Sequence, residues 1–136
     1  MADLIYPELS YEIVGVLFDV YNKLGSSYKE KYYQRAVGKL LLNKGFDIKR
    51  ELKADLEIQG EQIGYYFLNF LVEGLIVLEL KAKPRMSKQD FKQVQSYLGT
   101  TGLKLGILAN FGRPEGLNFY RVLNSSYSLF TGKYED

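Results

Sequence analysis

Cysteine, histidine and tryptophan are all absent from this chain of 136 residues. The lack of cysteine excludes disulfide bonds, thiol nucleophiles, iron–sulfur clusters and cysteine zinc sites. The lack of histidine excludes the usual catalytic triads and imidazole-held metals. Any chemistry must therefore come from Asp, Glu, Lys, Tyr, Ser, Thr and backbone groups. A bound metal would need oxygen ligands, which favours magnesium, manganese or calcium.

Long apolar runs are also missing. The N-terminal segment MADLIYPELS has no basic region followed by an apolar one, and no stretch approaches the ~18–20 apolar residues of a membrane span. We therefore expect a soluble, cytoplasmic protein. Hydrophobic residues at 46% and charged residues at 25% fit a globular protein of this length. We predict a single domain over residues 1–124 and a weakly tethered tail over residues 125–136.

The formal net charge of +2 hides an uneven distribution. Residues 1–30 carry two basic and five acidic side chains. The stretch from Lys81 to Lys104 carries six basic side chains against Asp90 alone. We therefore expect one basic face on a nearly neutral protein.

Two segments near the N-terminus have apolar side chains at helical spacing. The first lies between Pro7, which favours a helix start, and Gly25, which favours a helix end. Its apolar positions are Leu9, Ile13, Val16, Leu17, Val20 and Leu24. The second runs from about Tyr28 to Lys44, with Gly45 just past its end. Its apolar stripe consists of Tyr33, Val37, Leu40 and Leu41.

The middle of the chain has the patterns of three strands. From Phe46 to Ile58 apolar residues alternate with polar ones, which is typical of a half-buried strand. The segments IGYYFLNFLV and LIVLELKAK are denser in apolar residues, as expected for central strands buried on both faces. Turns are predicted at residues 59–61 and, as a hairpin, around Glu73 and Gly74.

A third helix and further strands follow Pro84. Ser87 and Asp90 have the spacing of a helix N-terminus, and Gly102 favours the end of that helix. The segment KLGILANF predicts another buried strand, and LNFYRVLN a last strand or helix. The order helix, helix, three strands, helix, strand predicts an α/β fold with a central mixed sheet flanked by helices.

Glu79 and Lys81 are candidates for chemistry because they lie on one face of an otherwise apolar strand. Burying either charge alone would be costly, so their pairing needs an explanation. One explanation is a functional site. The other is a structural ion pair, or a strand end that reaches solvent.

Glu30 is a third candidate, on the same helical stripe as Tyr33. It also has a simpler interpretation. Ser27 and Glu30 fit a capping box, in which the Glu30 carboxylate would accept a hydrogen bond from the Ser27 amide.

Several of these residues resemble a known family. Gly25, Glu30 and Tyr33, followed by YFLNFLVEGLIVLELKAK, QVQSYL and LKLGILANF, are similar to the GxxExxY proteins of the PD-(D/E)XK nuclease superfamily. The similarity extends from the first helix to about Leu123. It implies the same mixed-sheet fold, α-α-β-β-β-α-β here, and metal-dependent hydrolysis of phosphodiester bonds in nucleic acid, with DNA as the expected substrate.

The resemblance also implies roles for individual residues. Glu79 and Glu30 would hold Mg²⁺ or Mn²⁺, with Leu80 included in the metal set, and Lys81 would be the lysine of the motif. Gln93 would support the site from the third helix, with Tyr97 one turn later and Tyr33 as a supporting residue of the second helix. Oxygen ligands suit such hard ions, which lower the pKa of bound water without any histidine.

Asn69 departs from the family pattern, because the family has an aspartate at this position of the second strand. An asparagine offers a neutral carbonyl oxygen in nearly the same volume, so Asn69 could contribute to catalysis and metal binding with one negative charge less. The sequence therefore predicts impaired catalysis, whether Asn69 is natural or engineered.

The register of the hairpin decides whether Asn69 and Glu79 share a face. A two-residue turn at Glu73 and Gly74 would place Asn69 opposite Leu78, on the wrong face. We instead predict a three-residue loop, Val72 to Gly74, with Gly74 in the left-handed conformation. The predicted pairs are Leu71 with Leu75, Asn69 with Val77 and Phe67 with Glu79, which makes Asn69 and Glu79 diagonal neighbours.

Basic residues directly after the proposed site are candidates for phosphate contacts: Lys83, Arg85, Lys88 and Lys92. The alternative is a solvated helix face. Tyr65 and Tyr66 offer stacking surfaces, although aromatic residues in strands more often serve packing. Small nucleases often dimerise to reach across a duplex, so a homodimer is one alternative for the assembly.

Three hypotheses follow. The first is a metal-dependent nuclease of nucleic acid that Asn69 impairs. The second is a catalytically inactive nucleic-acid-binding or assembly module with the same fold. The third is a domain in which Glu79 and Lys81 form a purely structural pair.

Overall fold

Two amphipathic helices open the chain, where the apolar spacing predicts them. In the computed structural model, which describes residues 5–125 and 134–135, they are α1 (Pro7–Leu24) and α2 (Glu30–Asn43). Gly25 follows α1 with φ of 72°, and Gly45 follows α2 with φ of 86°. Both values lie in the left-handed region that glycine adopts without a steric penalty, so these two residues end their helices as predicted.

A mixed sheet forms the centre of the fold, and its six strands within the described residues follow chain order. All neighbours are antiparallel except β3 and β4, which are parallel. This exception arises because helix α3 (Lys88–Thr101) carries the chain back between them. The strands are β1 (Ile48–Ile58), β2 (Glu61–Val72), β3 (Ile76–Lys81), β4 (Leu105–Asn110), β5 (Asn118–Leu123) and β6 (Tyr134–Glu135). The predicted α/β class is confirmed, and LNFYRVLN forms a strand.

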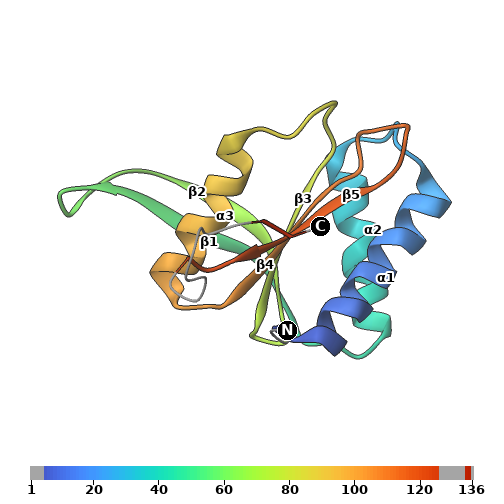
Figure 1. Cartoon of the computed structure of the whole chain (residues 1–136), viewed down its shortest axis with the longest axis horizontal. Coiled ribbons are helices and arrows are strands. Elements are labelled where there is room, and N and C mark those ends of the chain that lie inside the picture. Colours follow the sequence, from blue (N-terminus) through green and yellow to red (C-terminus); the bar gives the residue numbers. More distant parts are fainter. Residues whose placement is uncertain (1–4, 126–133, 136) are drawn as a thin grey trace.

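Helices α1 and α2 cover one face of the sheet and α3 covers the other (Figure 1). Each layer has its own apolar core. The core beneath α1 and α2 includes Ile13, Leu17, Val37, Leu41, Phe70, Leu78 and Leu80. The core beneath α3 includes Leu68, Val77, Val94, Leu98, Leu108 and Val122. Strand β3 contributes to both cores, as expected for a central strand buried on both faces.

The outer half of the β1–β2 hairpin corrects one prediction. The segment IGYYFLNFLV was expected to be buried on both faces, but Ile63, Tyr65 and Phe67 are 62%, 58% and 50% exposed. The hairpin extends past the helices that cover the rest of the sheet (Figure 1). No helical layer therefore covers these side chains, and only the inner half of β2 is central.

Most of the predicted C-terminal tail, residues 125–136, lies outside the described residues. Of its described part, Tyr134–Glu135 forms β6, which pairs with β5 through Arg121 and Val122. Among residues 5–125 and 134–135, no helix combines the length and apolar character needed to cross a lipid bilayer.

Candidate active site

The β2–β3 hairpin brings Asn69 and Glu79 together, although not in the predicted register. Val72 pairs with Ile76 and Leu71 with Val77, so the loop is Glu73–Leu75 and not Val72–Gly74. The predicted pairs are therefore wrong. Glu73 and Gly74 both have positive φ, 55° and 67°, which shifts the loop by one residue. One step beyond the last regular pair, Phe70 with Leu78, this register places Asn69 directly opposite Glu79.

At this point side chains replace the regular ladder between the two strands. The Asn69 backbone N–H donates to Glu79 Oε1 at 2.9 Å. The Leu80 backbone N–H donates to Asn69 Oδ1 at 2.7 Å. The two strands are thus joined by a carboxylate and an amide, which holds both side chains between β2 and β3. The Leu80 side chain lies in the core beneath α1 and α2 and is fully buried.

Glu79 and Lys81 form a close ion pair in this site, with 3.0 Å between Lys81 Nζ and Glu79 Oε2. The Glu79 side chain is 4% exposed and that of Lys81 is 18% exposed. Burial raises the pKa of Glu79, an effect that Lys81 and the Asn69 N–H only partly offset. Burial lowers the pKa of Lys81, but Glu79, Glu30 and Asp90 together outweigh burial, so that this pKa is raised. Lys81 is therefore held as an ammonium ion.

Glu30 reaches the same site from the start of α2. Its negative charge contributes to the raised pKa of both Glu79 and Lys81. The alternative capping box with Ser27 is wrong, because Lys29 is the N-cap and has no side-chain capping bond. Glu30 Oε2 instead accepts a hydrogen bond of 2.7 Å from Gln34 Nε2, one turn later on α2.

Tyr33 explains why Gly25 and Glu30 occur together in the sequence. The Tyr33 hydroxyl donates to the Gly25 carbonyl at 2.5 Å and accepts from the Tyr28 backbone N–H at 3.2 Å. Its buried ring stacks on Phe111, with 4.5 Å between the ring centroids. Tyr33 thereby fixes the connection between α1 and α2, which sets where α2 begins and where Glu30 lies. It acts on the site through position alone.

Asp90, at the start of α3, lies between two lysines. Its carboxylate is 2.7 Å from Lys83 Nζ and 4.0 Å from Lys81 Nζ. The same carboxylate accepts from the Ser87 backbone N–H at 2.8 Å, which completes the predicted capping box. Burial raises the pKa of Asp90, but the bonds from Lys83 and Ser87 outweigh burial and lower it overall. Sequence reasoning assigned Asp90 a capping role and missed its pairing with lysines.

The four basic residues proposed for phosphate contacts lie in different surroundings. Lys83 forms an ion pair with Asp90, and its side chain is 36% exposed. Lys88 and Lys92 are exposed on α3. Arg85 is exposed in the loop between β3 and α3 and lines a surface pocket. The predicted basic face is thus smaller than the sequence suggests, because Asp90 neutralises its first part.

Gln93 and Tyr97 lie on α3, next to Tyr66 of β2. The Gln93 carbonyl accepts a hydrogen bond of 2.9 Å from the Tyr66 hydroxyl. Burial raises the pKa of Tyr66, and the charge of Glu79 adds to this effect. Tyr66 and Tyr97 line one pocket together, and burial raises the pKa of Tyr97. Tyr66 thus links α3 to the strand that carries Asn69.

The site has the right kind of donor for a hard divalent cation, but few of them. Glu79 and Glu30 supply carboxylates, whereas Asn69 has its single acceptor oxygen directed to the Leu80 N–H. Within residues 5–125 and 134–135, no group of three or more Asp or Glu side chains is close enough to hold a metal ion. The ligand atoms are therefore of the type that a hard divalent cation prefers, but the carboxylate expected at position 69 is missing.

Comparison with known proteins gives a consistent result. The family model of the PD-(D/E)XK nuclease superfamily matches residues 7–122. A search of curated proteins found no match. A solved structure described as "Crystal structure of SSO0001" has 15% sequence identity and a TM-score of 0.54, and the match covers 70% of this chain. The chain spans about half of that solved chain, 50% of its length. At this identity the likeness supports the fold alone.

Proposed function

The chain belongs to the PD-(D/E)XK nuclease superfamily, and from this premise we propose that it binds DNA through a phosphodiesterase site that Asn69 impairs. Within the superfamily we assign it to the GxxExxY proteins, on the basis of Gly25, Glu30 and Tyr33. The proposed catalytic residues are Glu79, Lys81 and Gln93, with Asn69 at the position of a fourth. The proposed metal set is Glu30, Glu79 and the backbone oxygen of Leu80, with Asn69 at the position of a further ligand.

The observation that carries this proposal is the hydrogen-bonded junction between β2 and β3. Asn69 and Glu79 face each other there, Leu80 N–H binds the Asn69 side chain, and Lys81 pairs with Glu79. Such an arrangement costs stability, because a carboxylate and an ammonium lose most of their hydration. A purely structural junction could use an ordinary ladder of backbone hydrogen bonds at lower cost. The charges therefore favour a functional site.

Lys81 has the properties of a phosphate-binding group. Its raised pKa keeps the ammonium charged at neutral pH, so it can donate hydrogen bonds but cannot serve as a general base. Its partial exposure leaves it open to an anion at the surface of the site. A divalent cation held by Glu79 and Glu30 would supply the charge that polarises a phosphate and lowers the pKa of water.

Asn69 impairs this site through its hydrogen-bonding pattern as well as its charge. The side-chain oxygen accepts from Leu80 N–H, so the other atom of the amide is a nitrogen that carries two hydrogens. An NH₂ group repels a cation. An aspartate in the same conformation would keep the bond to Leu80 and present its second oxygen to the metal.

The test is the substitution Asn69→Asp, assayed for cleavage of single-stranded, duplex and branched DNA with Mg²⁺ or Mn²⁺. We expect cleavage to rise by roughly 10- to 100-fold over the parent protein, because a missing metal ligand is restored. The control is the double variant Asn69→Asp/Glu79→Gln, in which the activity should disappear. Failure of Asn69→Asp to cleave any of these substrates with either metal would refute the nuclease proposal.

A second candidate function is a nucleic-acid-binding or assembly module without catalysis. It is favoured by one observation, that the described residues contain no cluster of three acidic side chains suited to a metal. This candidate predicts salt-sensitive DNA binding by both the parent protein and Asn69→Asp, with no cleavage by either.

A further inference from the structure

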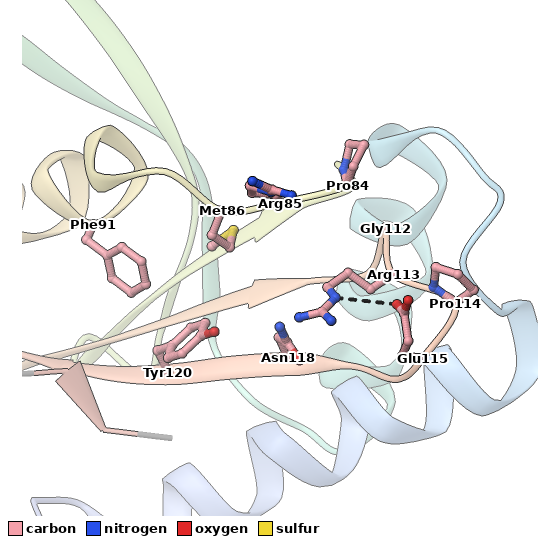
Figure 2. A pocket seen from close by; sticks show the side chains of 10 residues that line it. All are labelled: Pro84, Arg85, Met86, Phe91, Gly112, Arg113, Pro114, Glu115, Asn118 and Tyr120. Carbon is pink, nitrogen blue, oxygen red and sulfur yellow. Dashed lines mark ion pairs between the residues drawn. The ribbon is translucent and has the colours of Figure 1, made fainter.

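A pocket of about 730 Å³ lies beside the candidate site, between the β3–α3 loop and strand β5. Figure 2 shows Met86 and Arg85 facing Tyr120 and Asn118 across it. Phe91 closes one end, and the turn with Arg113, Pro114 and Glu115 closes the other (Figure 2). Of the residues given a role above, Arg85 alone lines this pocket.

The walls of the pocket are held in place by a fully buried amide. Asn110 Oδ1 accepts from the backbone N–H groups of Lys83 and Gly112, at 3.1 and 3.0 Å. Asn110 Nδ2 donates to the Lys83 carbonyl at 2.9 Å. The backbones of Lys83 and Gly112 also pack closely, since a Cβ at Gly112 would clash with the backbone of Lys83. The pocket is therefore preformed, with two of its loops clamped together.

The first turn of α3 connects this pocket to the candidate site. Asp90 is 4.0 Å from Lys81 and 2.7 Å from Lys83, and the next residue, Phe91, lines the pocket. The pocket wall formed by Pro84, Arg85 and Met86 belongs to the loop that follows Lys81 at the end of β3. A nucleic-acid strand that contacts Lys81 thus needs only a short path past the start of α3 to enter the pocket.

The lining has groups that suit each part of a nucleotide. The rings of Tyr120 and Phe91 are 5.0 Å apart at 73° and offer aromatic surface to a base. The Asn118 side chain carries both a donor and an acceptor, which match the edge of an unpaired base. Arg85 and Arg113 supply positive charge, of which the exposed Glu115 neutralises part, at 3.5 Å from Arg113 Nε.

We propose that this pocket binds one nucleotide with an unpaired base, adjacent to the phosphate that the candidate site contacts. The inference rests on the proposed function and narrows its substrate class to DNA with a single-stranded or bulged position. A base in a continuous duplex is stacked and paired, so it cannot present its face to Tyr120 or its edge to Asn118. Arg85 contacts the phosphate of the same nucleotide.

Another surface that combines aromatic and basic side chains lies around the start of α2. Tyr28 and Tyr32 are exposed there, and Arg35 lies over the Tyr32 ring at 6.0 Å. This surface is open and its cations are not arranged around a polar group that could read a base edge. Arg35 therefore serves as the matched control for Arg85.

The test compares binding of fluorescein-labelled oligothymidine, a continuous duplex, and the same duplex with one unpaired thymidine. Anisotropy is measured on the parent protein without added metal, so that binding is separated from cleavage. We expect the single strand and the bulged duplex to bind about tenfold more tightly than the continuous duplex. Tyr120→Leu should abolish this preference, and Arg85→Ala should weaken binding of all three while Arg35→Ala should not.

Equal affinity for the three DNAs would overturn the inference, as would a preference that persists in Tyr120→Leu or depends on Arg35 instead of Arg85. Because Tyr120 is packed beside α3, Asn118→Asp provides a second variant with nearly unchanged volume. Its carboxylate should repel DNA at the pocket and reduce the preference. Cleavage by Asn69→Asp without any preference would refute the pocket alone, whereas a preference without cleavage would refute the nuclease proposal alone.

Discussion

Replacing Lys81 with methionine tests whether Glu79 is a buried charge that depends on its partner. The Lys81 ammonium lies 3.0 Å from Glu79 Oε2, and the Glu79 side chain is only 4% exposed. Removal of one member of a buried ion pair typically costs about 3–5 kcal/mol. Because Lys81 is partly exposed and Glu79 can take up a proton, we expect Lys81→Met to lower the free energy of unfolding by roughly 2–3 kcal/mol. For a chain of this size the melting temperature should fall by about 8–12 °C.

The pH dependence of this loss gives the sharper result. Burial already raises the pKa of Glu79 in the folded protein. The protonated Glu79 side chain therefore contributes its full stability at low pH, and this contribution is lost as the pH rises through the pKa of Glu79 in the folded protein. Without Lys81 the pKa of Glu79 rises further. The deficit of Lys81→Met should therefore be small near pH 5 and grow toward about pH 8.

Thermal unfolding followed by circular dichroism measures this deficit. The control is Glu79→Gln/Lys81→Met, which removes both charges and leaves an amide oxygen to accept the Asn69 N–H. We expect the double variant to recover more than half of the lost stability. A Lys81→Met variant with the stability and pH dependence of the parent would refute the argument, and so would a double variant as unstable as the single one.

Other predictions concern the framework around the site. Gly112→Ala should cost about 1–3 kcal/mol in chemical denaturation, because the new Cβ would meet the Lys83 backbone, whereas Gly38→Ala meets only a flexible side-chain end and should stay within about 1 kcal/mol. Equal effects of the two would contradict the close backbone approach. Ser87→Ala should cost about 1 kcal/mol by loss of the cap. Asp90→Asn should lower the free energy of unfolding at neutral pH. Because the pKa of Asp90 is lowered, the parent loses this contribution as the pH falls below the ordinary carboxyl pKa of 3.8, and the variant has none to lose. Identical acid unfolding of parent and variant would count against this role.

Local sequence signals predicted the elements of the fold well. The apolar spacing predicted both N-terminal helices, and Gly25 and Gly102 predicted where helices end. These effects act within a few residues, so the local sequence was sufficient to predict them. The extent of burial in β2 was not predictable in the same way. Ile63 and Tyr65 are as apolar as a central strand requires, and only the length of the hairpin relative to the helices leaves them exposed.

The candidate site was predicted less completely. The sequence indicated Glu79, Lys81 and Glu30, but the contact between Asn69 and Glu79 depends on a hairpin register that positive φ at Glu73 decides. A glutamate in the left-handed conformation has no clear sequence signal. The role of Asn110 was also missed, because the Lys83 backbone, with which it forms two hydrogen bonds, becomes its neighbour only when β3 and β4 pair.

The central claim is that Asn69 occupies the position of a missing metal ligand, and calorimetric titration with Mn²⁺ tests it most directly. The account predicts that Asn69→Asp binds one Mn²⁺ at least about tenfold more tightly than the parent protein, and that adding Glu79→Gln abolishes the gain. Equal Mn²⁺ affinity in the parent and in Asn69→Asp would contradict the account, as would a gain that survives the loss of Glu79.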